Sequence, residues 1–143
     1  MKINVSFRAG IEDDHSFILN SWLRSYYNTA NINPVIPRKV FFKHEPDLIK
    51  YFLKEHYTMV AYDPNDRSHI LGYCVYKPEL DLLHYIYVKD SFRNLGIGKQ
   101  LLEESFHRLK ELNCSYWTPR LKRFKNNYYF NYNPYLKRVN YDL

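Results

Sequence analysis

The stretch VKDSFRNLGIGK, residues 88–99, joins an apolar run typical of a strand to a run with helical periodicity. Two of the four glycines in the chain, Gly96 and Gly98, fall here at the predicted start of the helix. Glycine permits close backbone approach and unusual dihedral angles, so several N–H groups can point outward from such a loop. The helix N-terminus adds a partial positive charge, and Arg93 and Lys99 add full ones. The stretch therefore predicts a binding place for a phosphate or pyrophosphate.

Two common phosphate-binding motifs do not fit this stretch. A Walker loop needs a glycine five residues before Gly98 and a Ser or Thr after the lysine, where this chain has Arg93 and Gln100. A Rossmann fingerprint needs a third small residue where Leu101 stands, and it belongs near the first strand of a longer chain. What remains is the pattern Arg-x-x-Gly-x-Gly after a strand.

The elements around this stretch predict a mixed α/β domain. Alternating or apolar runs predict strands at residues 5–8, 57–62, 70–76, 82–88 and 114–118. The last two are expected to be parallel, because a helix crosses over between them.

Helical spacing and capping signals predict three main helices. The first carries Ile18 to Tyr26, with Asp13 and Asp14 offering N-cap carboxylates, and a loop with two prolines follows over 28–42. The second has Pro46 in its first turn, and the third follows Gly98 and ends at Asn113. Pro119 opens a short basic helix, and 128–139 is predicted as a last strand or hairpin broken at Pro134. The expected order is β-α-α-β-β-β-α-β-α-β.

The composition is that of an ordinary globular chain. A length of 143 residues suits a single domain over residues 1–143. With 45% apolar and 25% charged residues, disordered and collagen-like classes are excluded. Cys74 and Cys114 match no metal spacing and form no disulfide framework, and the histidines are scattered, so no metal site is predicted.

The start of the chain, residues 1–6, has no apolar segment of the kind a secretory signal carries. No run approaches eighteen apolar residues, so no membrane span is expected. These features predict a cytoplasmic protein without membrane partners.

The pattern Arg-x-x-Gly-x-Gly after a strand resembles the coenzyme-A loop of the GNAT (Gcn5-related N-acetyltransferase) superfamily. The element order, the chain length and a strand ending Tyr85-Ile86-Tyr87-Val88 agree with it. The resemblance covers roughly residues 3–118 well and the last 25 less well. It implies a mostly antiparallel sheet with a splayed parallel strand pair, and acetyl-CoA as co-substrate. It also implies these cofactor-binding residues: Ile86, Tyr87, Val88, Arg93, Asn94, Leu95, Gly96, Ile97, Gly98 and Lys99.

By the same resemblance, the loop amides hold the pyrophosphate of acetyl-CoA. The strand before the loop splays from its parallel neighbour and pairs with the pantetheine arm through free backbone groups. The main-chain contacts fall on Ile86 and Val88, whose side chains are expected in the core.

Direct attack of an amine on a thioester requires a neutral amine, a polarised carbonyl and a proton donor for the leaving thiolate. His84 is the candidate base, acting directly or through water, since histidine titrates near the operating pH. A buried histidine bonded to a neighbour is the alternative interpretation.

The candidate acid follows from the family, whose members often use a Tyr on the helix after the strand at 114–118. Counting forward reaches Tyr128 or Tyr129, with Tyr135 in reserve. The usual Tyr-x-x-x-Gly-Phe ending is absent, and aligning Phe130 to its Phe places Lys125 at the tyrosine position. The assignment of Tyr128 as the acid therefore competes with a purely structural role.

The net charge of +6 is a C-terminal feature. Residues 119–143 hold six Lys/Arg against Asp142, whereas residues 1–118 hold fifteen basic against fourteen acidic residues. A localised positive charge points to an anionic ligand or partner, for which the 3′-phosphate of CoA is one candidate.

Three functions remain open from the sequence. The first is an N-acetyltransferase that acts on a primary amine of unknown identity, with the loop at 28–42 placed where related enzymes bind the acceptor. The second is a nucleic-acid-binding module that uses the basic, aromatic residues Arg120, Lys122, Arg123, Phe124, Lys125, Tyr128 and Tyr129. The third is a non-catalytic CoA-binding domain of the same fold.

Overall fold

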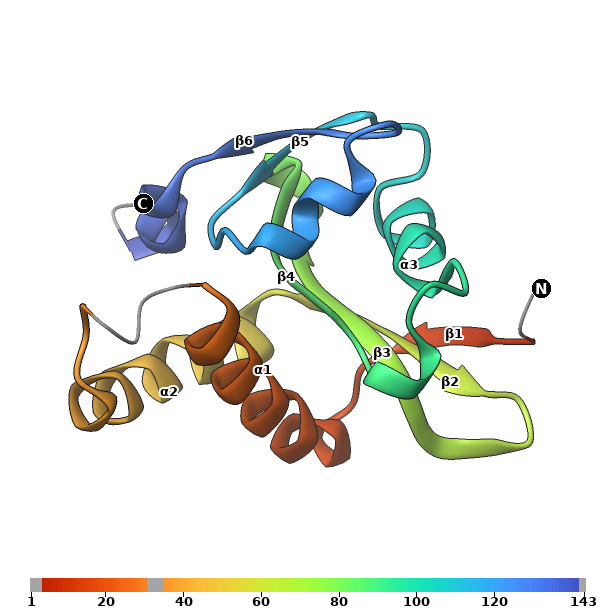
Figure 1. Cartoon of the computed structure of the whole chain (residues 1–143), viewed down its shortest axis with the longest axis horizontal. Coiled ribbons are helices and arrows are strands. Elements are labelled where there is room, and N and C mark those ends of the chain that lie inside the picture. Colours follow the sequence, from red (N-terminus) through yellow and green to blue (C-terminus); the bar gives the residue numbers. More distant parts are fainter. Residues whose placement is uncertain (1–3, 31–34, 142–143) are drawn as a thin grey trace.

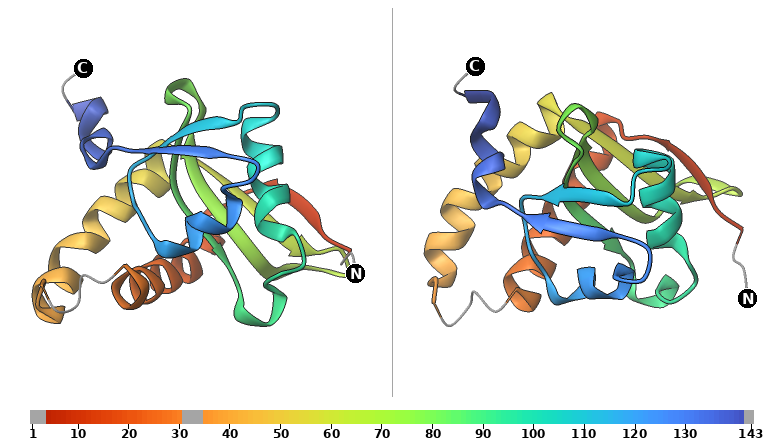
Figure 2. Two further views of the ribbon diagram at one scale, coloured as in Figure 1. Left: turned by 45° about the horizontal axis from the view of Figure 1, so that its top comes forward. Right: turned by 90° about the horizontal axis from the view of Figure 1, so that it is seen from above.

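A computed structural model describes residues 4–30 and 35–141, with the side chains of 139–141 left aside. Its centre is one six-stranded sheet in the order β1-β2-β3-β4-β5-β6 (Figures 1 and 2). The strands are β1 (Ser6–Ala9), β2 (Tyr57–Asp63), β3 (Asp66–Lys77), β4 (Leu82–Val88), β5 (Glu111–Cys114) and β6 (Tyr129–Tyr132). Strands β1 to β4 pair antiparallel, and β4–β5 and β5–β6 pair parallel. The predicted fold class and element order are confirmed.

Helices cover both faces of the sheet (Figure 1). The helices α1 (His15–Thr29) and α2 (Arg38–Glu55) pack on one face, through an aromatic cluster centred on Trp22 and Phe52. The helix α3 (Ile97–Phe106) packs on the other face, where its apolar stripe meets residues such as Leu71 and Leu112. Burial of these two apolar stripes provides the main drive for folding.

Strands β4 and β5 separate soon after they meet. Their pairing covers only Leu82 with Asn113 and Leu83 with Cys114. Beyond this point β4 continues to Val88, whereas the chain after Cys114 turns away from the sheet (Figure 1). A wedge therefore opens on the β5 side of β4. A β-bulge lies at the same place, because Leu83 and Tyr85 face consecutive residues of β3 and leave His84 as the extra residue.

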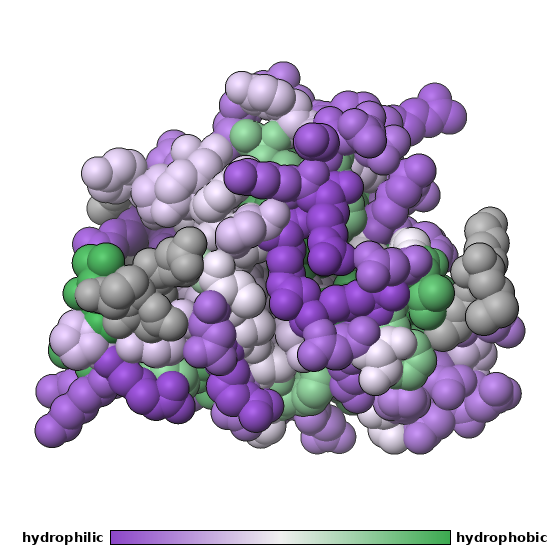
Figure 3. Space-filling model, in the orientation of Figure 1, coloured by the Kyte–Doolittle hydropathy of each residue, from purple (hydrophilic) through white to green (hydrophobic). Residues whose placement is uncertain are grey.

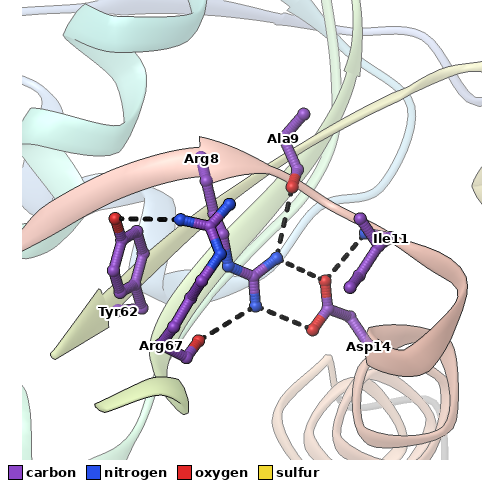
Figure 4. A network of polar contacts seen from close by, with 6 residues as sticks. All are labelled: Arg8, Ala9, Ile11, Asp14, Tyr62 and Arg67. Atoms are coloured by element: carbon purple, nitrogen blue, oxygen red, sulfur yellow. Dashed lines mark hydrogen bonds and ion pairs between the residues drawn. The ribbon is translucent and has the colours of Figure 1, made fainter. Parts of the chain in front are cut away.

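Asp14 does not cap α1 through its side chain as predicted. A short 3-10 turn, η1 (Glu12–Asp14), precedes the helix, and the Asp14 carboxylate accepts two hydrogen bonds from Arg8, at 2.7 and 2.9 Å (Figure 4). The carboxylate also accepts the Ile11 N–H at 2.8 Å. A buried, bidentate ion pair satisfies this carboxylate better than a cap bond would, and it joins β1 to the start of α1.

Pro46 does not lie in the first turn of α2 but inside the helix, which begins at Arg38. The predicted loop at 28–42 is therefore too long at its C-terminal end, and its residues 31–34 lie outside the described residues. Phe41 and Phe42 pack against Tyr27 of α1, at ring distances of 5.0 and 5.6 Å. This tertiary packing extends the helix backward through a segment that the proline signal marked as irregular.

The elements after α3 are shifted relative to the prediction. Helix α3 ends at Phe106 rather than Asn113, because His107 takes a positive φ of 55°. Leu109, which falls within the predicted helix, lies beyond the end of α3 and is 40% exposed. Strand β5 consequently begins at residue 111 instead of 114, and no strand forms over 115–118.

The C-terminal part is mostly 3-10 helix. The basic helix after Thr118 is η4 (Pro119–Phe124), and η5 (Pro134–Tyr141) follows β6. The predicted strand or hairpin over 128–139 is thus one short strand, which pairs parallel with β5. The break at Pro134 is where expected.

Candidate functional site

The predicted phosphate-binding stretch lies in the wall of a cleft between β4, the start of α3 and η4. About 210 Å³ of the cleft is open to the centre of a water molecule, and its mouth opens to solvent. Figure 3 shows strongly hydrophilic side chains around a hollow in the centre of this face. Nine of the ten predicted cofactor residues line the cleft: Ile86, Tyr87, Val88, Arg93, Asn94, Gly96, Ile97, Gly98 and Lys99. Leu95 does not.

The predicted cofactor residues are only part of the lining, which also includes Tyr85 and Phe92 from β4 and the loop after it. The opposite wall consists of Thr118, Arg120, Arg123, Phe124 and Asn127. The sequence had linked the basic segment 119–143 to an anionic ligand, but it had not assigned these residues to the cofactor site. A signal for Thr118 was present, because Thr followed by Pro is a common helix start. Because Thr118 was assigned to the strand predicted over 114–118, this helix-start signal was not used.

The backbone of the loop leaves donors for a ligand. Asn94 and Gly96 have positive φ, at 65° and 85°, a region that favours glycine and, among other residues, asparagine. Gly96 is the N-cap of α3 and has no side chain that could cap the first N–H groups of the helix. These N–H groups and the helix dipole remain available to an anion.

Gly98 is required for a different reason. A Cβ built on it would lie 2.8 Å from Cζ of Phe124, which comes from η4. Real carbon atoms pack at about 3.5–4.0 Å, so any side chain here displaces the aromatic ring. Gly98 therefore lets η4 close against α3.

Three guanidinium groups gather at this end of the cleft. Arg93 donates to the Val88 carbonyl at 2.8 Å and forms an ion pair with Asp90. Arg123 donates to Oδ1 of Asn94 at 2.9 Å. Burial, then the charge of Arg93, lowers the pKa of Arg120. The three arginines carry more positive charge than the single carboxylate of Asp90 balances. An anionic ligand would therefore relieve the repulsion among the guanidinium groups.

The floor of the cleft is the splayed edge of β4. Among the described residues, no strand pairs with this edge beyond Leu83. The side chains of Ile86 and Val88 pack against the core cluster beneath α3, as predicted. The Val88 carbonyl already accepts a hydrogen bond from Arg93, and the part of the edge between Leu83 and Val88 is open to an extended ligand.

The inner end of the cleft is closed by aromatic side chains. A small cavity, with about 10 Å³ open to the centre of a water molecule, is lined by Leu83, His84, Tyr85, Ile86, Tyr116, Thr118 and Leu121. Tyr85 stacks on Trp22 at 4.9 Å and its hydroxyl bonds Ser25 at 2.6 Å. Tyr116 donates its hydroxyl to Glu45 of α2. Because these side chains are fixed by packing and hydrogen bonds, the closed end is a rigid wall.

His84 is one of the residues that line the small inner cavity, but only 1% of its surface is exposed. Its Nδ1 is 2.6 Å from the Ser115 hydroxyl and its Nε2 is 2.8 Å from Nδ1 of His56. Its ring stacks on Phe52 at 3.8 Å. Burial, and then the charge of His56, lowers the pKa of His84 well below its ordinary value. Both ring nitrogens therefore engage the protein rather than the cleft, and His56 is a partner that sequence reasoning missed.

Tyr128, the predicted acid, is not brought to the cleft. Its ring is buried in the cluster beneath α3, with the Lys110 ammonium 5.1 Å from the ring centroid. Its hydroxyl has no hydrogen-bond partner among the described residues, and burial raises its pKa. The two alternative tyrosines also lie outside the cleft. Tyr129 and Tyr135 are 66% and 83% exposed and line neither cavity. Within the described residues, none of the three tyrosines suggested by the sequence lines the cleft.

No group of three potential metal ligands gathers within residues 4–30 and 35–141. In the same part of the chain, no helix is long and apolar enough to cross a membrane.

A sheet that splays between two parallel strands, with a glycine-rich helix start beside the wedge, places this domain in the acetyltransferase class. The chain belongs to the acetyltransferase (GNAT) family, whose sequence model matches residues 17–128. No curated protein matches the chain.

Solved structures share the fold at low sequence identity. A structure from Pyrococcus furiosus described as an acetyl transferase is 19% identical to this chain. The match has a TM-score of 0.59 and covers 97% of this chain and 91% of that one. A structure from Corynebacterium glutamicum, described as histone acetyltransferase HPA2 and related acetyltransferase, is 17% identical to this chain. The match has a TM-score of 0.56 and covers 72% of this chain and 70% of that one. Apo-form YjaB from Escherichia coli is 17% identical, with a TM-score of 0.53 over 72% of this chain, but the match spans only 65% of YjaB.

Proposed function

We propose that this protein is an N-acetyltransferase that moves an acetyl group from acetyl-CoA to a primary amine. One observation carries the proposal: the open helix start, the three arginines and the free edge of β4 all line the same cleft. Each of these features matches one part of acetyl-CoA. The features follow one another along the cleft in the same order as the parts of acetyl-CoA that they match.

The fit of acetyl-CoA follows from these features. The pyrophosphate would accept hydrogen bonds from the N–H groups at residues 96–99, and Arg120 and Arg123 would neutralise the remaining phosphate charge. The pantetheine arm would pair with the β4 edge toward Tyr85. The thioester then lies at the inner end, beside Thr118.

The reaction is direct attack of the amine on the thioester carbonyl carbon, with loss of the CoA thiolate. Thr118 is the N-cap of η4 but makes no side-chain cap hydrogen bond. Its hydroxyl is therefore available to hydrogen-bond the departing sulfur. In this proposal Thr118, rather than Tyr128, is the residue that contacts the leaving sulfur.

His84 remains the candidate base, but the geometry restricts how it would work. Its ring nitrogens bond Ser115 and His56, so it would receive the proton through one of these neighbours. A relay of this kind predicts that His84→Gln and Ser115→Ala both lower turnover by roughly 10²-fold or more, with acetyl-CoA affinity preserved. A loss below tenfold in both would make His84 a structural residue.

The nucleic-acid alternative is weaker on this structure. Arg120 and Arg123, two of the basic residues on which it rests, face a cleft that has an enclosed inner end rather than an open surface. The exposed Lys122 of η4 and Lys125, which follows η4 directly, do not line the cleft.

Isothermal titration calorimetry with acetyl-CoA tests the proposal, followed by thiol release with a panel of primary amines. We expect micromolar binding and thiol release with at least one amine. Absence of acetyl-CoA binding would refute the function, and binding without turnover across the panel would favour the non-catalytic domain. An oligonucleotide mobility shift that weakens steeply with salt would favour the nucleic-acid module.

A further inference from the structure

A hydrogen bond between two distant segments joins the walls of the cleft. Nη1 of Arg123, which belongs to η4, donates to Oδ1 of Asn94 in the loop before α3, at 2.9 Å. Both residues line the cleft. Arginine has only donors, so the amide oxygen is the atom that can face it. The loop that leaves its N–H groups open to an anion therefore also holds a guanidinium on the opposite wall.

The bond leaves the charge of Arg123 intact. Arg93, in the same loop as Asn94, forms an ion pair with Asp90, and this carboxylate offsets its positive charge. The partner of Arg123 is a neutral amide, and none of the ion pairs in the described part of the chain includes Arg123. The amide fixes one N–H of the guanidinium, and the full charge remains for a ligand.

Arg123 needs to be held because it is an exposed side chain among like charges. Burial lowers the pKa of Arg120, and the charges of Arg93 and then Arg123 lower it further. A long side chain has many rotamers, and repulsion from its neighbours favours those that extend into solvent. The bond to Asn94 selects instead a rotamer in which Arg123 lines the cleft, so less ordering is left to the ligand.

The backbone of Asn94 suits it to this role. Its φ is 65°, a region that asparagine enters more readily than most residues other than glycine. Glycine would fit the same backbone but would offer no acceptor. Aspartate would offer an acceptor whose charge cancels that of Arg123. Asparagine combines the required backbone with a neutral acceptor.

We propose that Asn94 is a positioning residue whose side chain holds Arg123 toward the phosphate groups of acetyl-CoA without neutralising it. This inference rests on the proposed function and adds to it a residue that acts through a second one. It makes two demands. The contribution of the Asn94 side chain to binding should disappear when Arg123 is absent, and a charged acceptor at residue 94 should be worse than a neutral one.

Three substitutions separate this role from a structural one. Asn94→Gly removes the amide and keeps a residue that accepts the positive φ. Asn94→Asp keeps the acceptor but gives it a negative charge. Arg123→Ala is the second arm of a double-mutant cycle with Asn94→Gly. The matched control is Asn126→Gly, because Asn126 is exposed and does not line the cleft.

Calorimetry with acetyl-CoA at low and high salt measures affinity, and thermal denaturation measures stability. We expect Asn94→Gly to weaken binding by roughly 3- to 10-fold, as one hydrogen bond would, but by less than about twofold in the Arg123→Ala background. Asn94→Asp should keep or raise thermal stability, because an ion pair replaces the neutral bond. It should nevertheless weaken binding by about tenfold or more, most strongly at low salt. Asn126→Gly should bind as the wild type does.

Three results would overturn the inference: wild-type affinity in Asn94→Gly, an equal loss with and without Arg123, or full affinity in Asn94→Asp. The second would mean that Asn94 contacts the ligand by itself, and the third that the bond merely joins the loop to η4. Absence of binding by the wild-type protein would instead refute the proposed function, and the inference with it.

Discussion

Substitution of Gly98 by alanine tests whether η4 must close on α3 to form the cofactor site. The added Cβ lies 2.8 Å from Cζ and 3.2 Å from Cε1 of Phe124. To reach an ordinary contact of about 3.5 Å, the ring must retreat by roughly 0.7 Å. Overpacking of this kind costs about 1–3 kcal/mol. Phe124 follows Arg123 directly, so its displacement also moves a guanidinium that we assign to the phosphates.

We expect Gly98→Ala to weaken acetyl-CoA binding by roughly 5- to 150-fold, the range that about 1–3 kcal/mol represents. Calorimetry measures the affinity, and thermal denaturation shows that the variant is folded. The double variant Gly98→Ala, Phe124→Leu should recover most of the affinity, because the smaller side chain accommodates the new methyl group.

Gly96→Ala is the matched control. Its Cβ would meet only the Gln100 side chain, at 3.8 Å, but its φ of 85° is unfavourable for alanine. Any loss in this variant comes from the backbone, so Phe124→Leu should not repair it. Wild-type affinity in Gly98→Ala, or equal rescue of both glycine variants, would refute the closure argument.

Three further predictions follow from the same geometry. Arg123→Ala should weaken the affinity for acetyl-CoA by about tenfold, as expected for one charge-assisted contact of about 1.5 kcal/mol, and should reduce the salt dependence of binding. Lys125→Ala should change neither quantity. Equal effects of the two substitutions would show that Arg123 is not part of the site. Leu121→Ala should raise the affinity for butyryl-CoA relative to acetyl-CoA by roughly tenfold, since each buried CH₂ contributes about 0.8 kcal/mol; an unchanged ratio would show that the acyl group does not enter the inner cavity. Burial, and then the charge of Lys77, lowers the pKa of His56 to about 4. Between about pH 6.5 and 4 the unfolded chain therefore binds a proton at His56 that the native chain does not bind. Thermal stability should consequently fall as the pH drops through this range. His56→Gln combined with His84→Gln should flatten that slope, and an unaltered slope would show that other groups control it.

Much of the fold was predictable because its signals are local. The apolar runs of β2, β3 and β4 and the stripe of α3 are periodic over their own residues. The glycine-rich start of α3 and its basic residues could be assigned to an anion for the same reason. These features do not depend on what packs against them, and they place nine of the ten predicted cofactor residues along one cleft.

The errors fall where packing between distant segments outweighs a local signal. Pro46 indicates a helix start, but Phe41 and Phe42 pack on Tyr27 and extend α2 eight residues further back. The positive φ of His107 ends α3 early, so β5 begins three residues before the predicted strand.

The sequence by itself determined the class of fold, the order of its elements and the wall of the cleft built by residues 86–99, because each is encoded within one short segment. The tertiary structure alone decided how the cleft is completed. It brings Arg123 of η4 against Asn94, and it buries His84 between His56 and Ser115. It also sets Lys137 on Tyr116. Each of these pairs is separated by more than twenty residues along the chain, and no local pattern specifies which distant side chains meet when two apolar faces are buried together.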